Sequence, residues 1–145
     1  MATTTISQRF TELAEQAFQY WYNRTDVVFD DALFTTLKEQ AELLAAGGNL
    51  SAALRLLERA LWVAEQKGEP LHGALIWRAR ANVLQHHEQF EASLAAVNQA
   101  VALYQRYGTA LDVAKARTVE VALLATMGRF AEAEALGRWI QAQFE

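Results

Sequence analysis

Cysteine is absent from this 145-residue sequence, and proline and glycine are scarce. Without cysteine the chain can form no disulfide bond and carry out no thiolate chemistry, which suits a reducing compartment without requiring one. A single proline, Pro70, and seven glycines are too few to form the turns between the many short strands of an all-β protein. These shortages exclude thiol chemistry and argue against a β fold.

Long apolar runs are also missing. No stretch approaches the ~20 apolar residues that a membrane-spanning helix needs. The first ten residues, MATTTISQRF, lack the basic start and apolar run of a secretory signal. We therefore expect a soluble cytoplasmic protein with no membrane partner.

The sequence has no excess of positive charge. Its 17 acidic residues outnumber its 13 lysines and arginines, which gives a formal net charge of −4. Residues 1–69 hold ten acids and six bases, whereas residues 70–145 hold seven of each. Neither half attracts a polyanion, so we expect no nucleic acid partner.

What the sequence does contain is helix-forming material. Alanine, leucine, glutamate and glutamine dominate, and these residues lose little conformational freedom in a helix. Apolar residues make up 52% of the chain, enough to build a core. The length corresponds to one domain. Composition and length together predict a single all-α domain.

Three segments align without gaps at a constant offset, and they begin at Ala41, Ala81 and Val121. Small and large apolar residues recur in register, which lets two helices approach closely while neighbouring units interlock. The recurring columns are Ala41, Ala81 and Val121; Leu44, Leu84 and Leu124; Leu50, Phe90 and Phe130; Ala53, Ser93 and Ala133; and Ala60 and Ala100, before Ile140 breaks the last one. Such a pattern predicts a helical repeat.

Each unit reads as two antiparallel helices with a turn between them. Gly48 and Gly128 suit the left-handed residue that ends a helix, and Glu88 breaks that rule in the middle unit. Gly68 and Gly108 have the position of helix caps between units. The expected turns within units lie at 47–49, 86–88 and 127–129, and those between units at 67–70 and 107–109.

The predicted units are residues 31–69, 70–109 and 110–145. Pro70 suits the first turn of the helix that opens the second unit, because the missing N–H of proline costs nothing there.

From about residue 31 onward the chain resembles the tetratricopeptide repeat (TPR) family. The family's usual period is ~34 residues, so these longer units resemble the long-helix arrays of kinesin light chains and bacterial signalling ATPases. The family's aromatic residue in the first helix is present only as Trp77, with Leu37 and Arg117 at the equivalent places. HEAT and armadillo repeats have the same ~40-residue period as these units, so the subfamily stays open. The matching positions are Ala41 and Ala81, the Leu three residues later, Gly48 and Gly128, Ala53 and Ala133, and Ala60 and Ala100.

The resemblance implies a right-handed α-solenoid of three helical hairpins whose first helices line a concave groove. Such arrays bind proteins or peptides. On that face we place the candidate partner-binding residues Lys38, Glu42, Arg78, Asn82, Gln85, Lys115 and Thr118.

Both ends of the array carry apolar residues. A further amphipathic helix is expected at residues 6–23, where it would pack on the first repeat and shield its open side. The alternative is a self-association surface that includes Trp21 and Tyr22. In the last helix, positions that are apolar inside the array become polar, but Trp139 and Phe144 leave an apolar patch. A homodimer through one terminus therefore stays an open alternative.

Residues with catalytic or metal-binding chemistry are few. His86 and His87 are adjacent, and neighbours on a helix point about 100° apart, so they do not chelate one ion as a pair four residues apart would. They lie at an expected helix–helix turn, where a solvated polar residue is ordinary. His72 is isolated in the sequence, with no Cys, Asp or His nearby. We expect no catalytic residue, no metal and no cofactor. The sequence thus favours a protein-interaction scaffold, and the alternative is a regulatory subunit of a bacterial protease or ATPase system.

Overall fold

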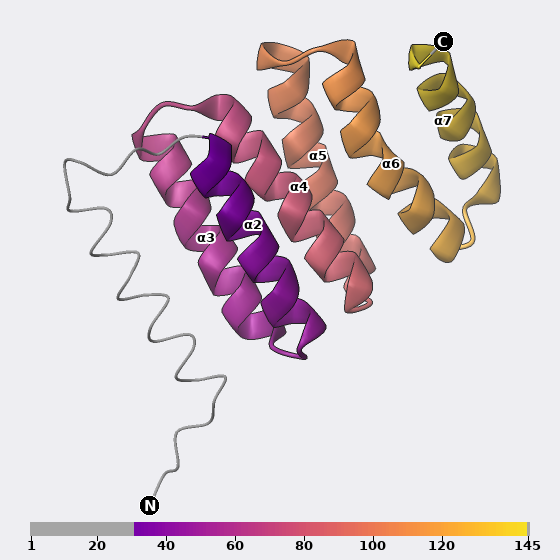
Figure 1. The fold of residues 1–145 in the computed structure, drawn as a ribbon. Helices are drawn as coiled ribbons and strands as arrows, with labels where there is room; N and C mark the ends of the chain where they lie inside the picture. The colour runs from indigo at the N-terminus through magenta and orange to yellow at the C-terminus, as the bar shows by residue number, and fades with distance from the viewer. Residues whose placement is uncertain (1–30, 145) are drawn as a thin grey trace, which may run out of the picture.

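The computed structural model describes residues 31–144, which form six α-helices and no strand. The expectation of an all-α chain is therefore confirmed for these residues. The helix expected at 6–23, with Trp21 and Tyr22, lies outside the described part of the chain. In chain order the helices are α2 (Asp31–Ala46), α3 (Leu50–Gln66), α4 (Pro70–His86), α5 (Phe90–Tyr107), α6 (Ala110–Thr126) and α7 (Phe130–Gln143) (Figure 1).

The helices follow one another at a constant step. From α3 onward they begin at Leu50, Pro70, Phe90, Ala110 and Phe130, so their starts are evenly spaced along the chain. Two of these steps make one repeat of the sequence. The expected first-turn position of Pro70 in α4 is confirmed.

Most of the turns use a left-handed residue to end a helix. Gly48, Gly68 and Gly128 have φ values of 86°, 68° and 80°, as the sequence predicts for Gly48 and Gly128. Glu88 takes the same role with a φ of 61° and is the one non-glycine residue with positive φ in the described chain. The turn was expected at residues 86–88. Helix α4 extends one residue into it and ends at His86.

Gly108 is a cap of a different kind. Its φ of −106° and ψ of −156° are extended, so the left-handed conformation of the other caps is not the reason for glycine here. A Cβ at this position would lie 2.8 Å from Oδ2 of Asp112 and 3.0 Å from the Tyr104 ring. Asp112 and Thr109 form a capping box that starts α6. A side chain at this position would therefore displace Asp112 from the capping box or crowd Tyr104, so lack of space favours glycine.

Each helix contacts its neighbours in sequence, and the first helices of the pairs also contact one another. Helix α4 touches α2 and, less extensively, α6. No backbone contact joins α3 to α5 or α5 to α7 in the described part of the chain. In Figure 1 the pairs α2–α3, α4–α5 and α6–α7 follow one another across the molecule. Helices α2, α4 and α6 thus form the more closely packed layer.

Helix α4 divides the core between its two sides. Its residues Ile76, Ala79 and Val83 are buried in one apolar cluster with α2 and α3. Ala74 and Ala81 belong to a second cluster, with α5 and α6. Because alanine occupies the closest approaches, helices can pack with their backbones near each other.

Helix α7 is the least buried of the six. Ala133 is its one buried residue, whereas α3 buries seven and α5 six. Phe130 is 69% exposed, although Phe90, at the equivalent position of the preceding unit, packs partly against the second core cluster. In the described chain α7 contacts α6 alone, which accounts for the difference.

Candidate functional site: the groove between α2 and α4

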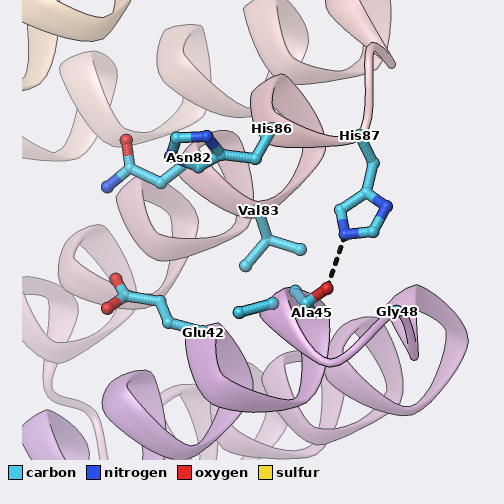
Figure 2. Close-up of a pocket in the computed structure, with 8 residues that line it drawn as sticks. Glu42, Ala45, Gly48, Asn82, Val83, His86 and His87 are labelled. Carbon is cyan, nitrogen blue, oxygen red and sulfur yellow. Dashed lines mark hydrogen bonds between the residues drawn. The ribbon is translucent and has the colours of Figure 1, made fainter.

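An open groove lies where the C-terminal halves of α2 and α4 run next to each other (Figure 2). Its volume is about 720 Å³, which is within the range of peptide- and ligand-binding clefts. Apolar side chains form the floor, and polar ones stand along the rim. The lining residues are Glu42, Ala45, Ala46, Gly48, Asn82, Val83, His86 and His87.

The floor is fixed by close helix packing. Val83 is 2% exposed and Ala45 is 5% exposed, so both belong to the core beneath the groove. The small side chain of Ala45 lets α4 approach α2. A side chain of a partner bound in the groove would therefore contact a rigid apolar surface.

The turn after α2 shapes one wall. The backbone N–H of Gly48 donates to the carbonyl of Ala45 at 3.0 Å, and that of Asn49 donates to the carbonyl of Leu44 at 2.9 Å. This pairing satisfies the last carbonyls of the helix and requires the left-handed Gly48. The Asn49 side chain then accepts from the N–H of Ala52 and starts α3. Hydrogen bonds at the end of α2 and at the start of α3 thus hold this wall in a tight turn.

His87 ties the ends of the two helices together. Its Nε2 lies 2.8 Å from the carbonyl oxygen of Ala45, and Figure 2 shows this bond across the groove. A carbonyl can only accept, so Nε2 must carry the proton and donate it. The sequence interpretation treated His86 and His87 alike, as polar turn residues. In the structure His86 is exposed, whereas His87 is partly buried and joins α4 to α2.

The structure brings three of the predicted partner-binding residues together. Glu42 and Asn82 line the groove from opposite helices, and both side chains point to the same open side in Figure 2. Lys38 lies one turn before Glu42, with its Nζ 3.6 Å from the Glu42 Oε1. This i, i+4 ion pair moderates the negative charge of the rim.

The other four predicted residues do not line the groove. Arg78 and Gln85 are partly buried elsewhere on α4. Lys115 and Thr118 are exposed on α6. The Thr118 hydroxyl donates to the carbonyl of Ala114, four residues earlier, so it is already satisfied within its helix.

The sequence interpretation did not place six of the eight lining residues in a binding site: Ala45, Ala46, Gly48, Val83, His86 and His87. Gly48 was recognised as a helix end but not as a groove wall. Val83 could have been found from the repeat, because it falls in one column with Leu43 and Leu123. The bond from His87 had no sequence signal, since it joins residues 42 positions apart.

Arg78 is close enough to the buried Tyr104 to influence its ionisation. Burial raises the pKa of the Tyr104 phenol above its ordinary value, and the positive charge of Arg78 partly opposes the shift. Asp112 adds a smaller effect in the raising direction. The phenol therefore stays neutral over a wider range of pH than an exposed tyrosine would.

His72 corrects the sequence interpretation that left it isolated. Its Nε2 lies 2.5 Å from Oδ1 of Asp31, and its ring stacks on Phe34 with centroids 4.4 Å apart. Asp31 and Phe34 belong to the preceding unit of the repeat, so no local pattern could reveal them. The Nδ1 atom is buried without a hydrogen-bond partner. The contact with Asp31 and the stacking on Phe34 thus join the start of α4 to the start of α2.

The aromatic residues of α7 do not form one stripe. The side chain of Arg117 lies over the Trp139 ring at 5.6 Å from its centroid, and Trp139 remains 39% exposed. Phe144 follows the last helical residue and is 56% exposed. Five positions along a helix turn the side chain by about 140°, so the two rings lie on different sides of α7.

Comparisons with protein-family models, with curated proteins and with solved structures find no match to this chain. Within the described residues, no group of three or more His, Cys, Asp or Glu side chains could hold a metal ion. No helix of this part of the chain has the length and apolar character to cross a membrane.

Proposed function

We propose that this chain is a protein-interaction scaffold that binds a peptide, or a segment of a partner protein, in the groove between α2 and α4. In this proposal the pairs α2–α3, α4–α5 and α6–α7 are three TPR-like hairpins of a right-handed α-solenoid. The absence of cysteine from the sequence suits a scaffold that acts in the cytoplasm.

The groove is the observation that carries the proposal. A rigid apolar floor of Ala45 and Val83 offers contact area, while Glu42, Asn82 and His86 offer polar groups on the rim. This combination of an apolar surface with a few placed polar groups is typical of binding clefts.

The packing of the helices supports a concave face on this side. The first helices contact one another, whereas the second helices make no such contact among the described residues. Where successive units are related by a small rotation that brings the first helices closer together than the second ones, the array is concave on the side of the first helices. The groove would then lie on the inner face, where an extended partner can touch several helices.

To test this proposal, we would change the rim with the double variant Glu42→Lys and Asn82→Lys. Both side chains are partly exposed, so the change should leave the fold intact while it inverts the charge of the rim. Partners recovered with the immobilised wild-type chain would be titrated against the variant by calorimetry. We expect the affinity to fall tenfold or more, which corresponds to about 1.4 kcal/mol.

The matched control is Glu65→Lys with Asn98→Lys, which makes the same two substitutions on exposed positions of α3 and α5. This variant should keep the wild-type affinity. Equal affinities for the groove variant and the wild type would place the binding surface elsewhere and contradict the proposal.

A further inference from the structure

One face of α2 is open where the same face of α4 and α6 is covered. Leu43 is 66% exposed, yet Val83 and Leu123, at the equivalent positions of the next two units, are 2% and 0% exposed. Thr36 is exposed as well, whereas the equivalent Ile76 is 1% exposed. We call the side of α2 that carries Thr36 and Leu43 its leading face.

Chemically, the leading face can accept an apolar neighbour. The Thr36 hydroxyl donates to the carbonyl of Ala32 at 2.9 Å, so its hydrogen bond is made within α2 and its methyl group is left for contact. Leu43 contributes a large apolar side chain.

In the rest of the array two preceding helices contact the helix that carries this face. Helix α4 contacts both α3 and α2, and α6 contacts both α5 and α4. The register is visible at Gly73 of α4, where a Cβ would lie 3.8 Å from Cδ1 of Leu61 on α3 and 3.7 Å from Cδ1 of Leu103 on α5. The occupant of the leading face of α2 should therefore be a helix that comes just before α2 in the chain.

The sequence provides such a segment at the expected distance. The second helices begin at Leu50, Phe90 and Phe130, and one further repeat backwards reaches Phe10. The same step from Leu61 reaches Trp21. Leu13 and Ala17 fall in the columns of the buried Ala53 and Leu57 of α3, whereas Glu12 and Gln16 fall in those of the buried Ala52 and Leu56. The apolar residues of this segment thus match part of the face that α3 turns to the array.

We propose that residues 6–22 dock on the leading face of α2 in the same chain and in the register of α3 on α4, with Trp21 against Leu33. Trp21 and Leu33 have the same spacing in the sequence as Leu61 and Gly73. The part of the chain before α2 is long enough for one helix and its turn, because it exceeds the step from one helix start to the next. This docking is independent of partner binding in the groove.

The absence of native cysteine permits a direct test in the full-length chain. The variant Trp21→Cys with Leu33→Cys would be oxidised, and the linked peptides would be identified by mass spectrometry. We expect a disulfide within one chain, in a yield similar to that of the matched pair Leu61→Cys with Gly73→Cys. At Gly73 a Cβ meets its neighbours at ordinary contact distances, so a side chain at this position of the control pair fits the fold.

A second pair, Gln19→Cys with Leu33→Cys, tests the register. Residue 19 is two positions from residue 21 and points about 200° away from it, so this pair should give little disulfide. Similar yields for the two pairs would show that the segment is not docked in this register. Disulfides between two chains would identify a second copy as the occupant. Either result would overturn the proposal.

Tryptophan emission gives a measurement that does not depend on the cysteine variants. The difference between the spectra of the wild type and Trp21→Phe isolates the signal of Trp21. A docked Trp21 should emit at the wavelength of a buried indole. Emission at the wavelength of a solvated indole would contradict the docking.

Discussion

At the scale of single residues, the interior is organised around side chains of minimal size. Ala53, Ala60 and Ala100 are all 0% exposed, and Ser93 takes the same kind of place on α5. The Ser93 hydroxyl donates to the carbonyl of Ala81 at 2.6 Å, so its polarity is satisfied across the contact between α5 and α4. The sequence columns predicted this close packing, because the positions of Ala53 and Ser93 and those of Ala60 and Ala100 hold small residues in both units.

Tyr104 is the residue whose ionisation the fold should change most clearly. Because burial raises the pKa of its phenol in the folded state, the unfolded chain releases the proton first as the pH rises. The folded state should therefore lose stability as the pH passes above about 10, the ordinary value for tyrosine. Below that pH this contribution is fully present.

We expect this alkaline loss to be smaller in Tyr104→Phe than in the wild type. Urea denaturation from about pH 8 to about pH 11 would give the free energy of unfolding of both proteins. The difference between them should be constant below about pH 10 and should change above it. Parallel curves over the whole range would exclude a raised pKa at Tyr104.

At the scale of the helices and their turns, the ends are set by a few backbone positions. Glycine in the left-handed conformation could be predicted at Gly48 and Gly128, because the residue itself signals the geometry. The role of Glu88 at a φ of 61° follows only from its alignment with those glycines. The extended conformation of Gly108 could not be predicted, since it depends on the space that Tyr104 and Asp112 leave.

Replacement of Glu88 by glycine should stabilise the turn between α4 and α5. A side chain with a Cβ is strained in the left-handed region by roughly 1 kcal/mol, and glycine removes this strain. We expect Glu88→Gly to raise the free energy of unfolding by about 0.5–1 kcal/mol in urea denaturation. The reciprocal change Gly128→Ala, at the equivalent turn, should lower it. A decrease in Glu88→Gly would show that the side chain has a stabilising role.

At the scale of the whole molecule, burial is unequal along the array. Helix α4 supplies residues to both core clusters, whereas α7 buries Ala133 alone. The decline of apolar residues in the last helix could be predicted from the sequence. The bonds that join distant units, from His87 to Ala45 and from His72 to Asp31, could not, because their partners are far apart in the sequence. The groove was therefore predicted only in part.

This inequality should be visible in amide hydrogen exchange. Local opening is easier where few apolar side chains are buried, so the amides of α7 should exchange faster than those of α4. Exchange followed by mass spectrometry would compare peptides from the two helices, with a dilution series as a control for association. Equal protection of α7 and α4 at every concentration would contradict the prediction. Protection of α7 that disappears on dilution would reveal a homodimer through this end.

The uniform step between helix starts has a consequence for how such a chain can change its length. Because every helix start recurs at the same interval, a copy of residues 70–109 inserted after itself would keep α3 before the first copy and α6 after the second. It would add one new junction, between α5 of the first copy and α4 of the second. Tandem duplication is thus a simple genetic route to a longer array, because it requires one new interface in the register that the chain already uses.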